Sequence, residues 1–311
     1  MLSRRNIRIK VMQLLYAKSR DPKLTLENIL KQYRENVSSS YELYLLSLLQ
    51  FTKVAQYSLH DASKRTAKLL PSDEDKQFKA QLAHNELIQS IIKNEDLYKM
   101  YRRFYLEAKL DKDSTRIIYS EFLKTDVYKS YIKKSEPSFD DNKQILLELY
   151  KHCINNELFT DKLEDHYPNW IDDKSLVIGT IKKTLKVLPA TDNFFEQYLP
   201  SDEAVKDFGE EMLRRVYQDD EDYLEIIEPT LKNWDADRVA IIDMILLKMS
   251  VCELLHFPTI PTKVTLNEFV EISKSYSTDK SKDFINGILD RLMKKLDKDG
   301  KIIKQGRGLQ E

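Results

Sequence analysis

Residues 281–290, SKDFINGILD, decide the fold class, because they allow two interpretations and only one agrees with the flanking sequence. The pair Asn286-Gly287 is typical of a two-residue hairpin turn between strands. The apolar residues around it, however, recur at helical spacing, which predicts a helix over 281–297. The expected core face of this helix is Phe284, Ile285, Ile288, Leu289, Leu292 and Leu296. Gly287 is then expected at a close contact between two helices.

The composition favours helices throughout the chain. The 311 residues include only six glycines and nine prolines, with 41% apolar and 32% charged residues. Scarce helix breakers and abundant Leu, Lys and Glu are typical of long helices. We therefore predict an all-α protein, and the length suggests about two domains.

Several classes of protein and site are not supported by the sequence. The formal net charge of −1 argues against a uniformly basic nucleic-acid-binding protein but leaves local patches possible. The two cysteines, Cys153 and Cys252, are far apart, which argues against a disulfide framework or a zinc site and fits a reducing compartment. There is no apolar run of 18 residues and no signal peptide, so we expect a soluble, cytoplasmic protein.

No catalytic or cofactor motif is present. The six glycines are scattered and form neither a dinucleotide-binding nor a phosphate-binding loop. The five histidines are dispersed, and the adjacent pairs His152-Cys153 and Asp165-His166 point to different helix faces. We therefore expect no metal, no cofactor and no enzymatic activity.

The first predicted helix, residues 3–20, carries a basic cluster. Ser3 can cap it, and Asp21-Pro22 ends it. Arg4 and Arg8 stack above the apolar positions that face the core, where a buried arginine would be costly. We therefore expect both arginines to project beyond the end of the helical bundle.

Helical patterns continue along the rest of the chain. A short second helix is expected over 22–36, a long apolar one over 40–70, and further helices to a boundary at Leu199-Pro200-Ser201-Asp202. Beyond it, Asp237 can cap a strongly apolar helix over 238–256. Thr265 and Glu268 match a capping box, with Val264 and Phe269 placed for a hydrophobic staple.

Motifs at both ends of the chain together resemble the NusB family. The stretch RRNIRIKVMQLLY, residues 4–16, is similar to the arginine-rich first helix of that family. The stretch LKMSVCEL, residues 247–254, resembles its helix ending in Glu-Leu, and IPTKVTLNE, residues 260–268, resembles its Pro-x-Lys-Val-x-x-Asn-Glu run. Residues 281–290 resemble its Phe-Val-Asn-Gly-Val-Leu-Asp signature.

The resemblance implies a discontinuous domain. Segments 1–36 and 203–297 would form one NusB-like RNA-binding helical domain, and residues 37–202 would be a helical insertion, which exposed loops tolerate. The tail, residues 298–311, is polar, basic and glycine-containing, and we expect it to be disordered.

The resemblance also implies a function. Family members bind boxA, a short single-stranded element of ribosomal RNA leader transcripts, together with the small-subunit ribosomal protein NusE, and act with other Nus factors on RNA polymerase elongation. Cations for phosphates and flat groups for unpaired bases suit such a ligand. The RNA-binding residues implied are Arg4, Arg5, Arg8, Lys10, Gln13, Tyr16, Lys280, Ser281, Lys282 and Phe284.

Each assignment has a structural alternative. The arginines could form a solubilising helix end, Phe284 could be a core residue, and Tyr16 could pack against the bundle. Lys263 and Asn267 could merely hold a loop, and Glu268 is expected to be a cap. Two departures, Asn6 where the family often has a basic residue and Lys280 where an acid is common, would shift the RNA footprint.

Two other functions compete with RNA-binding antitermination. One is a helical protein-interaction scaffold of the same fold without direct RNA binding. The other is an RNA cytosine methyltransferase of the kind that carries a NusB-like domain, but such enzymes need a separate Rossmann-like domain, for which this chain lacks the glycines and strands.

Overall fold

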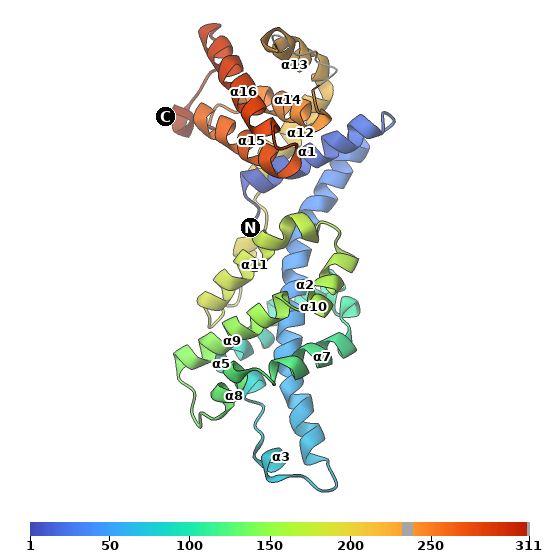
Figure 1. Ribbon diagram of the computed structural model, residues 1–311, viewed down its shortest axis with the longest axis vertical. Coiled ribbons are helices and arrows are strands. Elements are labelled where there is room, and N and C mark those ends of the chain that lie inside the picture. The colour runs from blue at the N-terminus through green and yellow to red at the C-terminus, as the bar shows by residue number, and fades with distance from the viewer. Residues whose placement is uncertain (232–238, 310–311) are drawn as a thin grey trace. The chain divides into compact units, whose positions relative to one another are not determined.

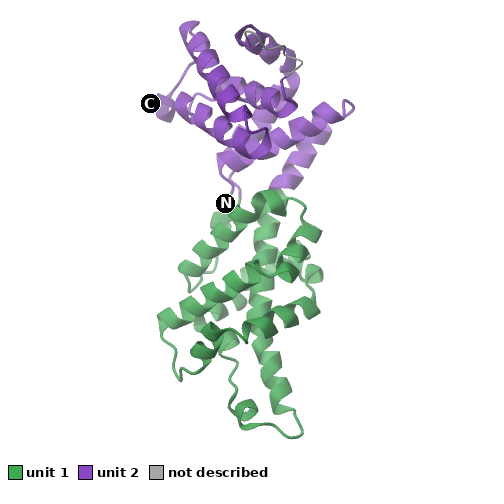
Figure 2. Cartoon of the chain, in the orientation of Figure 1, with its two compact units in different colours: residues 1, 38–199 green, residues 2–37, 200–311 purple. Residues whose placement is uncertain are grey.

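The computed structural model describes residues 1–231 and 239–309. Every regular element within these ranges is a helix, which confirms the predicted all-α class (Figure 1). The chain divides into two compact units, shown in different colours in Figure 2. Unit 1 consists of residue 1 and residues 38–199, and unit 2 consists of residues 2–37 and 200–311.

Unit 1 is built around the long helix α2, Leu26–Thr66, whose residues from 38 onward belong to this unit. Apolar side chains of α2 form one buried cluster with those of the shorter helices that follow it. Those elements are α3 Asp73–Gln77, α4 Gln81–His84, α5 Glu86–Ile92, α6 Glu95–Arg103, η1 Leu106–Lys109, α7 Lys112–Phe122, α8 Asp126–Ile132, α9 Phe139–Ile154, α10 Glu157–His166, α11 Trp170–Lys186 and η2 Glu196–Tyr198.

Helix α2 corrects the prediction of two helices over 22–36 and 40–70. The structure has one continuous helix of 41 residues there. Neither proline nor glycine interrupts residues 36–40, and the serines of this stretch are held by side-chain hydrogen bonds instead of opening a loop. Ser38 donates to Glu42 at 2.9 Å, and Ser40 donates to Asp173 at 2.6 Å, both within unit 1.

Unit 2 packs around helix α14, Ile241–His256, which is buried on nearly every side. This burial explains its mainly apolar sequence, since a helix that is hydrophobic on every face belongs in a core. The expected start of this helix at residue 238 and its cap, Asp237, lie outside the described residues. The other elements of the unit are α1 Arg4–Arg20, the π-helix η3 Glu203–Glu210, α12 Glu211–Gln218, α13 Asp220–Ile227, η4 Glu228–Thr230, α15 Thr262–Tyr276, α16 Ser281–Lys298 and η6 Gly306–Leu309.

Helix α16 follows the predicted span, and five of its six predicted core residues are buried. The exception is Phe284, which is only half-buried. Gly287 was predicted at a helix–helix contact, and this is wrong. A Cβ atom added to Gly287 would meet nothing within 4 Å, so the backbone there faces open space.

The C-terminal tail differs from the expected disordered segment. The Gln305 amide donates to the carbonyl oxygen of Pro258 at 3.0 Å, and the Lys304 ammonium donates to the carbonyl oxygen of Phe257 at 3.2 Å. A Cβ on Gly308 would lie 1.9 Å from the same Pro258 oxygen. The tail therefore packs on the loop between α14 and α15, and Gly308 permits the close backbone approach.

Gly209 in η3, like Gly308, lies where an added Cβ atom would clash, here in the core of unit 2. A Cβ there would lie 1.9 Å from the Tyr33 hydroxyl oxygen and 2.6 Å from Cγ2 of Ile7. We predict that Gly209→Ala lowers the free energy of unfolding by about 1–3 kcal/mol, because an overpacked core must shift. Gly287→Ala is the matched control and should stabilise the protein by roughly 0.5–1 kcal/mol, the usual gain for Ala in a helix. Thermal unfolding of both variants measures the two stability changes. Equal changes would contradict the tight packing around Gly209.

Candidate nucleic-acid interface

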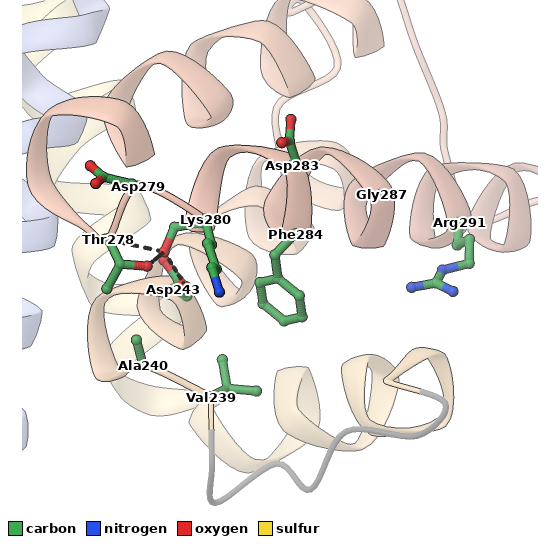
Figure 3. Close-up of a pocket in the computed structure, with 11 residues that line it drawn as sticks. Val239, Ala240, Asp243, Thr278, Asp279, Lys280, Asp283, Phe284, Gly287 and Arg291 are labelled. Carbon is green, nitrogen blue, oxygen red and sulfur yellow. Dashed lines mark hydrogen bonds between the residues drawn. The ribbon is translucent and has the colours of Figure 1, made fainter.

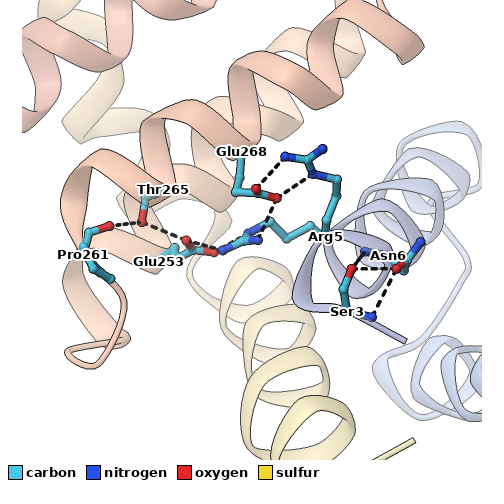
Figure 4. A network of polar contacts seen from close by, with 8 residues as sticks. Ser3, Arg5, Asn6, Glu253, Pro261, Thr265 and Glu268 are labelled. Carbon is cyan, nitrogen blue, oxygen red and sulfur yellow. Dashed lines mark hydrogen bonds and ion pairs between the residues drawn. The ribbon is translucent and has the colours of Figure 1, made fainter. Parts of the chain in front are cut away.

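The first helix begins at a capping box between Ser3 and Asn6. The Asn6 backbone amide donates to the Ser3 hydroxyl at 3.4 Å, and the Ser3 backbone amide donates to the Asn6 side-chain oxygen at 3.1 Å (Figure 4). The predicted Ser3 cap is thus confirmed. Asn6, which departs from the basic residue common in the family, has a structural role here because it starts the helix that carries the arginines.

Arg8 is buried, whereas the sequence predicted that it would project beyond the end of the bundle. Its side chain is 2% exposed and donates two hydrogen bonds, each 2.7 Å, to the carboxylate of Glu253. Its remaining nitrogen lies 3.3 Å from Glu268. The prediction failed because two acidic residues from α14 and α15 neutralise the guanidinium, which makes its burial possible.

Aromatic rings and a hydroxyl complete the surroundings of this buried pair. The Arg8 guanidinium lies 5.2 Å from the ring centre of Phe208 and 5.6 Å from that of Phe269, within cation–π range. The Thr265 hydroxyl donates to Glu253 at 2.8 Å. Every polar atom of the Glu253–Arg8 contact therefore faces a partner or a ring.

The predicted capping box at Thr265 and Glu268 is wrong. Helix α15 begins at Thr262, after Pro261, so Thr265 lies inside the first turn. Its side chain faces α14, and that of Glu268 faces α1 (Figure 4). The polar side chains that suggested a cap instead serve the buried arginine, and Val264, proposed for the staple, is 42% exposed.

Arg5 is exposed and Arg4 is half-buried at the start of α1. Arg4 pairs with Glu203 at 2.8 Å, and Arg5 donates to both oxygens of Glu268 at 2.8 and 2.6 Å. Both arginines line a surface hollow of about 560 Å³ together with Arg307 from the tail. This end of the unit therefore presents three guanidinium groups around one depression.

The later turns of α1 contribute less than predicted. Lys10 is only 3% exposed, which leaves little of its charge at the surface. Gln13 is half-buried, and Tyr16, three residues on, is 40% exposed. Among these three predicted RNA contacts, Tyr16 is the side chain best placed to meet an external ligand.

A second hollow, of about 680 Å³, lies beside the first turns of α16. Figure 3 shows Lys280, Phe284 and Arg291 extending to the same side of the helix, with Asp283 pointing away. Phe284 and Arg291 are separated by seven residues, or about two helical turns, and Gly287 between them leaves the helix surface open. An aromatic ring is thus flanked by two cations on one face.

The floor of this hollow is polar. Ser281 is 2% exposed and donates to Oδ2 of Asp243 at 2.7 Å, so its role is structural and it offers no surface to RNA. The other carboxylate oxygen of Asp243, Oδ1, is buried and has no hydrogen-bond partner in the described part of the chain.

The ten predicted residues thus fall into four groups. Arg4 and Arg5 gather at one hollow, and Lys280 and Phe284 gather at the other, with Lys282 exposed nearby. Arg8, Lys10 and Ser281 are buried, and Gln13 and Tyr16 lie along α1.

Sequence reasoning missed Arg291, Arg307 and Asp243. Arg291 could have been found from its seven-residue spacing to Phe284, whereas Arg307 lies in a segment expected to be disordered. Asp243 carries no signal in the sequence, since it stands within an apolar helix.

Two kinds of feature are absent from the described residues. No group of three or more His, Cys, Asp or Glu side chains in residues 1–231 and 239–309 is arranged to hold a metal ion. Within the same ranges, no helix is both long and apolar enough to cross a membrane.

Comparison with known proteins identifies the family. The family model described as the NusB family matches residues 177–294. The transcription antitermination protein NusB of Salinibacter ruber is 40% identical over 137 residues, which cover 42% of this chain and 86% of that protein. The NusB protein of Chloroherpeton thalassium is 40% identical over 109 residues, covering 35% of this chain and 52% of that protein.

A third relative, NusB of Natranaerobius thermophilus, is 45% identical over 74 residues, covering 24% of this chain and 53% of that protein. This chain thus spans about half the length of the second and third relatives. All three relatives are named as transcription antitermination proteins. The identity over most of the Salinibacter protein shows that the chain belongs to the NusB family.

The buried pair predicts a large difference between two neighbouring arginines. Arg8→Gln should lower the free energy of unfolding by about 3–5 kcal/mol, because it leaves the buried Glu253 carboxylate uncompensated. Arg5→Gln, which removes an exposed pair, should cost at most about 1 kcal/mol. Urea unfolding measures both, and similar losses would contradict the importance of the buried pair.

The Arg5–Glu268 pair predicts a dependence on pH. Burial alone would raise the pKa of Glu268, but the Arg5 hydrogen bond and the charges of Arg8 and Arg5 outweigh it and hold this pKa below its usual 4.5. A carboxyl with a lowered pKa stabilises the fold above its unfolded pKa, and this contribution is lost as the pH falls through the folded pKa. The stability difference between wild type and Arg5→Gln should therefore be present at neutral pH and shrink as the solution is acidified below about pH 4. Urea unfolding of both proteins measures this stability difference. If it stays constant as the pH falls, the role assigned to the Arg5–Glu268 pair is contradicted.

Proposed function

We propose that this chain is a non-catalytic transcription antitermination factor that binds boxA-like single-stranded RNA of ribosomal RNA leaders. It acts in the cytoplasm together with NusE, other Nus factors and RNA polymerase. Membership of the NusB family supports the class of function. The RNA-binding role is supported by the basic hollow at the start of α1 and by the ring between two cations at the hollow beside α16.

The arrangement of Lys280, Phe284 and Arg291 is the observation that carries the proposal. A half-buried ring at a hollow of about 680 Å³ offers a stacking surface for an unpaired base. The cations on either side suit the phosphates on either side of that base. Duplex nucleic acid would not expose its base faces to such a ring.

The hollow at the start of α1 supplies a second set of phosphate contacts. Arg5 and Arg307 are exposed there and Arg4 is half-buried. The ion pairs of Arg4 and Arg5 lie at the surface, where such pairs are weak enough for a phosphate to compete. Arg8 does not contact RNA in this proposal. It positions α1 against α14 and α15, and the exposed arginines depend on that placement.

We also propose the domain roles implied by the resemblance. Segments 1–36 and 203–297 form the RNA-binding domain, residues 37–202 are an insertion, and the tail contributes Arg307 to the basic hollow. The competing function, a scaffold without RNA binding, gains no specific support from the geometry, because a scaffold needs no aromatic ring between two cations.

The proposal predicts a specific salt dependence. Binding of a boxA-like RNA oligonucleotide, with and without NusE, is measured across a salt series. Lys280→Gln/Arg291→Gln should reduce the slope of log affinity against log salt by about 1.4, since each phosphate contact on a single strand contributes about 0.7. Phe284→Leu should weaken binding roughly 5- to 150-fold through lost stacking, with little change in slope.

The control Lys31→Gln/Lys301→Gln removes the same charge from exposed positions of unit 2 that line neither hollow. It should leave both affinity and slope near the wild-type values. If wild type shows no salt-dependent RNA binding even with NusE present, the proposal fails and the scaffold function is favoured.

A further inference from the structure

Unit 1 contains one strained residue at its surface, Tyr105. Its φ of 52° places it in the left-handed region, and it is the only non-glycine residue there in the described part of the chain. It ends α6 in the position where helices usually carry glycine, with its amide donating to the Arg102 carbonyl oxygen at 3.1 Å. Buried Tyr101 before it and buried Leu106 after it fix the turn.

The Tyr105 side chain is 79% exposed and makes no ring contact with another described residue. A large aromatic residue is thus held in a conformation that asparagine or glycine would adopt more easily, without burial to compensate for it. Backbone strain of this kind clusters at functional sites, where the surrounding structure holds the residue in its conformation.

Two exposed arginines precede this ring. The Arg102 guanidinium lies 5.8 Å from the ring centre of Tyr98, and that of Arg103 lies 5.6 Å from the ring centre of Phe104. Neither forms an ion pair with a carboxylate among the described residues. The segment from Tyr98 to Tyr105 therefore combines the rings of Tyr98, Phe104 and Tyr105 with the unneutralised guanidinium groups of Arg102 and Arg103. We call this segment the basic-aromatic ridge.

The ridge continues into a groove of about 740 Å³ in the same unit. Lys53 connects the two, because it lies 5.9 Å from the Tyr98 ring and also lines the groove. The remaining groove lining includes Lys64 and Lys112, which form no ion pair in the described ranges, and the rings of Tyr57 and His60 at 5.2 Å from each other.

The acidic side chains of the groove already have hydrogen-bond or ion-pair partners. Asp111 accepts the amides of Asp113 and Ser114 at the start of α7, and Asp113 pairs with Arg116 at 3.4 Å. Glu107 accepts from the Tyr98 hydroxyl at 2.8 Å and lies 3.6 Å from Lys53. Exposed cations and rings are therefore what the ridge and groove offer to a ligand.

We propose that the basic-aromatic ridge and this groove are a second binding site for single-stranded RNA, separate from the hollows of unit 2. Tyr105 stacks on an unpaired base, Arg102 and Arg103 contact the flanking phosphates, and the strand continues past Lys53 into the groove. Rings interleaved with cations suit a single strand, because every base has a face to stack and every nucleotide carries a charge. An acidic peptide would use the cations but not the fixed ring.

The site is mapped by photo-crosslinking the full-length protein to a 4-thiouridine-containing oligouridine. Trypsin cleaves after Arg103 and Lys109, so the peptide of residues 104–109 contains Tyr105, and the peptide of residues 283–291 contains Phe284. A crosslink on the first peptide supports this inference, whereas one on the second tests the proposed function of unit 2 independently. Absence of any crosslink on residues 104–109 overturns the inference.

Binding affinity is then compared in the background Lys280→Gln/Phe284→Leu/Arg291→Gln, which removes the α16 hollow. Tyr105→Asn should weaken oligouridine binding roughly 5- to 150-fold, as expected for one lost stack. The same variant should keep or raise the melting temperature, because asparagine tolerates the left-handed conformation. Tyr105→Phe, which keeps the ring, should bind like the background protein.

Arg102→Gln/Arg103→Gln should reduce the salt slope by about 1.4, the value for two phosphate contacts on a single strand. The control Lys182→Gln/Lys186→Gln removes two exposed charges from α11 of the same unit and should change neither slope nor affinity. Equal affinity of Tyr105→Asn and the background protein, or equal binding of a duplex or a polyglutamate peptide, would contradict single-strand recognition.

Discussion

The buried ion pair between Arg8 and Glu253 is the interaction on which the arrangement of unit 2 depends. It joins the first helix to the central helix α14, and Glu268 and Thr265 connect α15 to the same group. An unpaired charge in this position would be strongly destabilising, so the three helices have to meet with the guanidinium and both carboxylates present. Their meeting also fixes where the neighbouring arginines, Arg4 and Arg5, reach the surface.

Much of the fold could be predicted from the sequence, because local patterns determine it. The all-α class, the Ser3 cap and the apolar face of α16 follow from helix propensity, capping chemistry and spacing. The burial of Arg8 could not be predicted in this way, because its partners lie 245 and 260 residues further along the chain. The error at Thr265 has the same origin, since a capping pattern and a long-range ion-pair network use the same residue types.

The candidate site was only partly predictable for similar reasons. Sequence motifs identified the helices that carry it but could not separate exposed cations from buried ones, as Arg5 and Arg8 show. Arg307 was not predicted because the composition of its segment is typical of disorder, whereas the close approach of Gly308 to the Pro258 carbonyl and the hydrogen bonds of Gln305 and Lys304 hold that segment in place. In unit 1, the left-handed backbone of Tyr105 is visible only in three dimensions. Both proposed RNA surfaces combine an aromatic ring at the end of a helix with neighbouring cations.

Hydrogen–deuterium exchange of the full chain with and without a boxA-like RNA tests most directly whether the hollows of unit 2 bind RNA. Binding there should slow exchange at the start of α1 and in residues 278–291, while the buried Arg8 pair keeps the core of α14 protected in both states. Slower exchange confined to residues 38–199, or no change at either hollow of unit 2, would contradict the claim that these hollows form the RNA-binding surface.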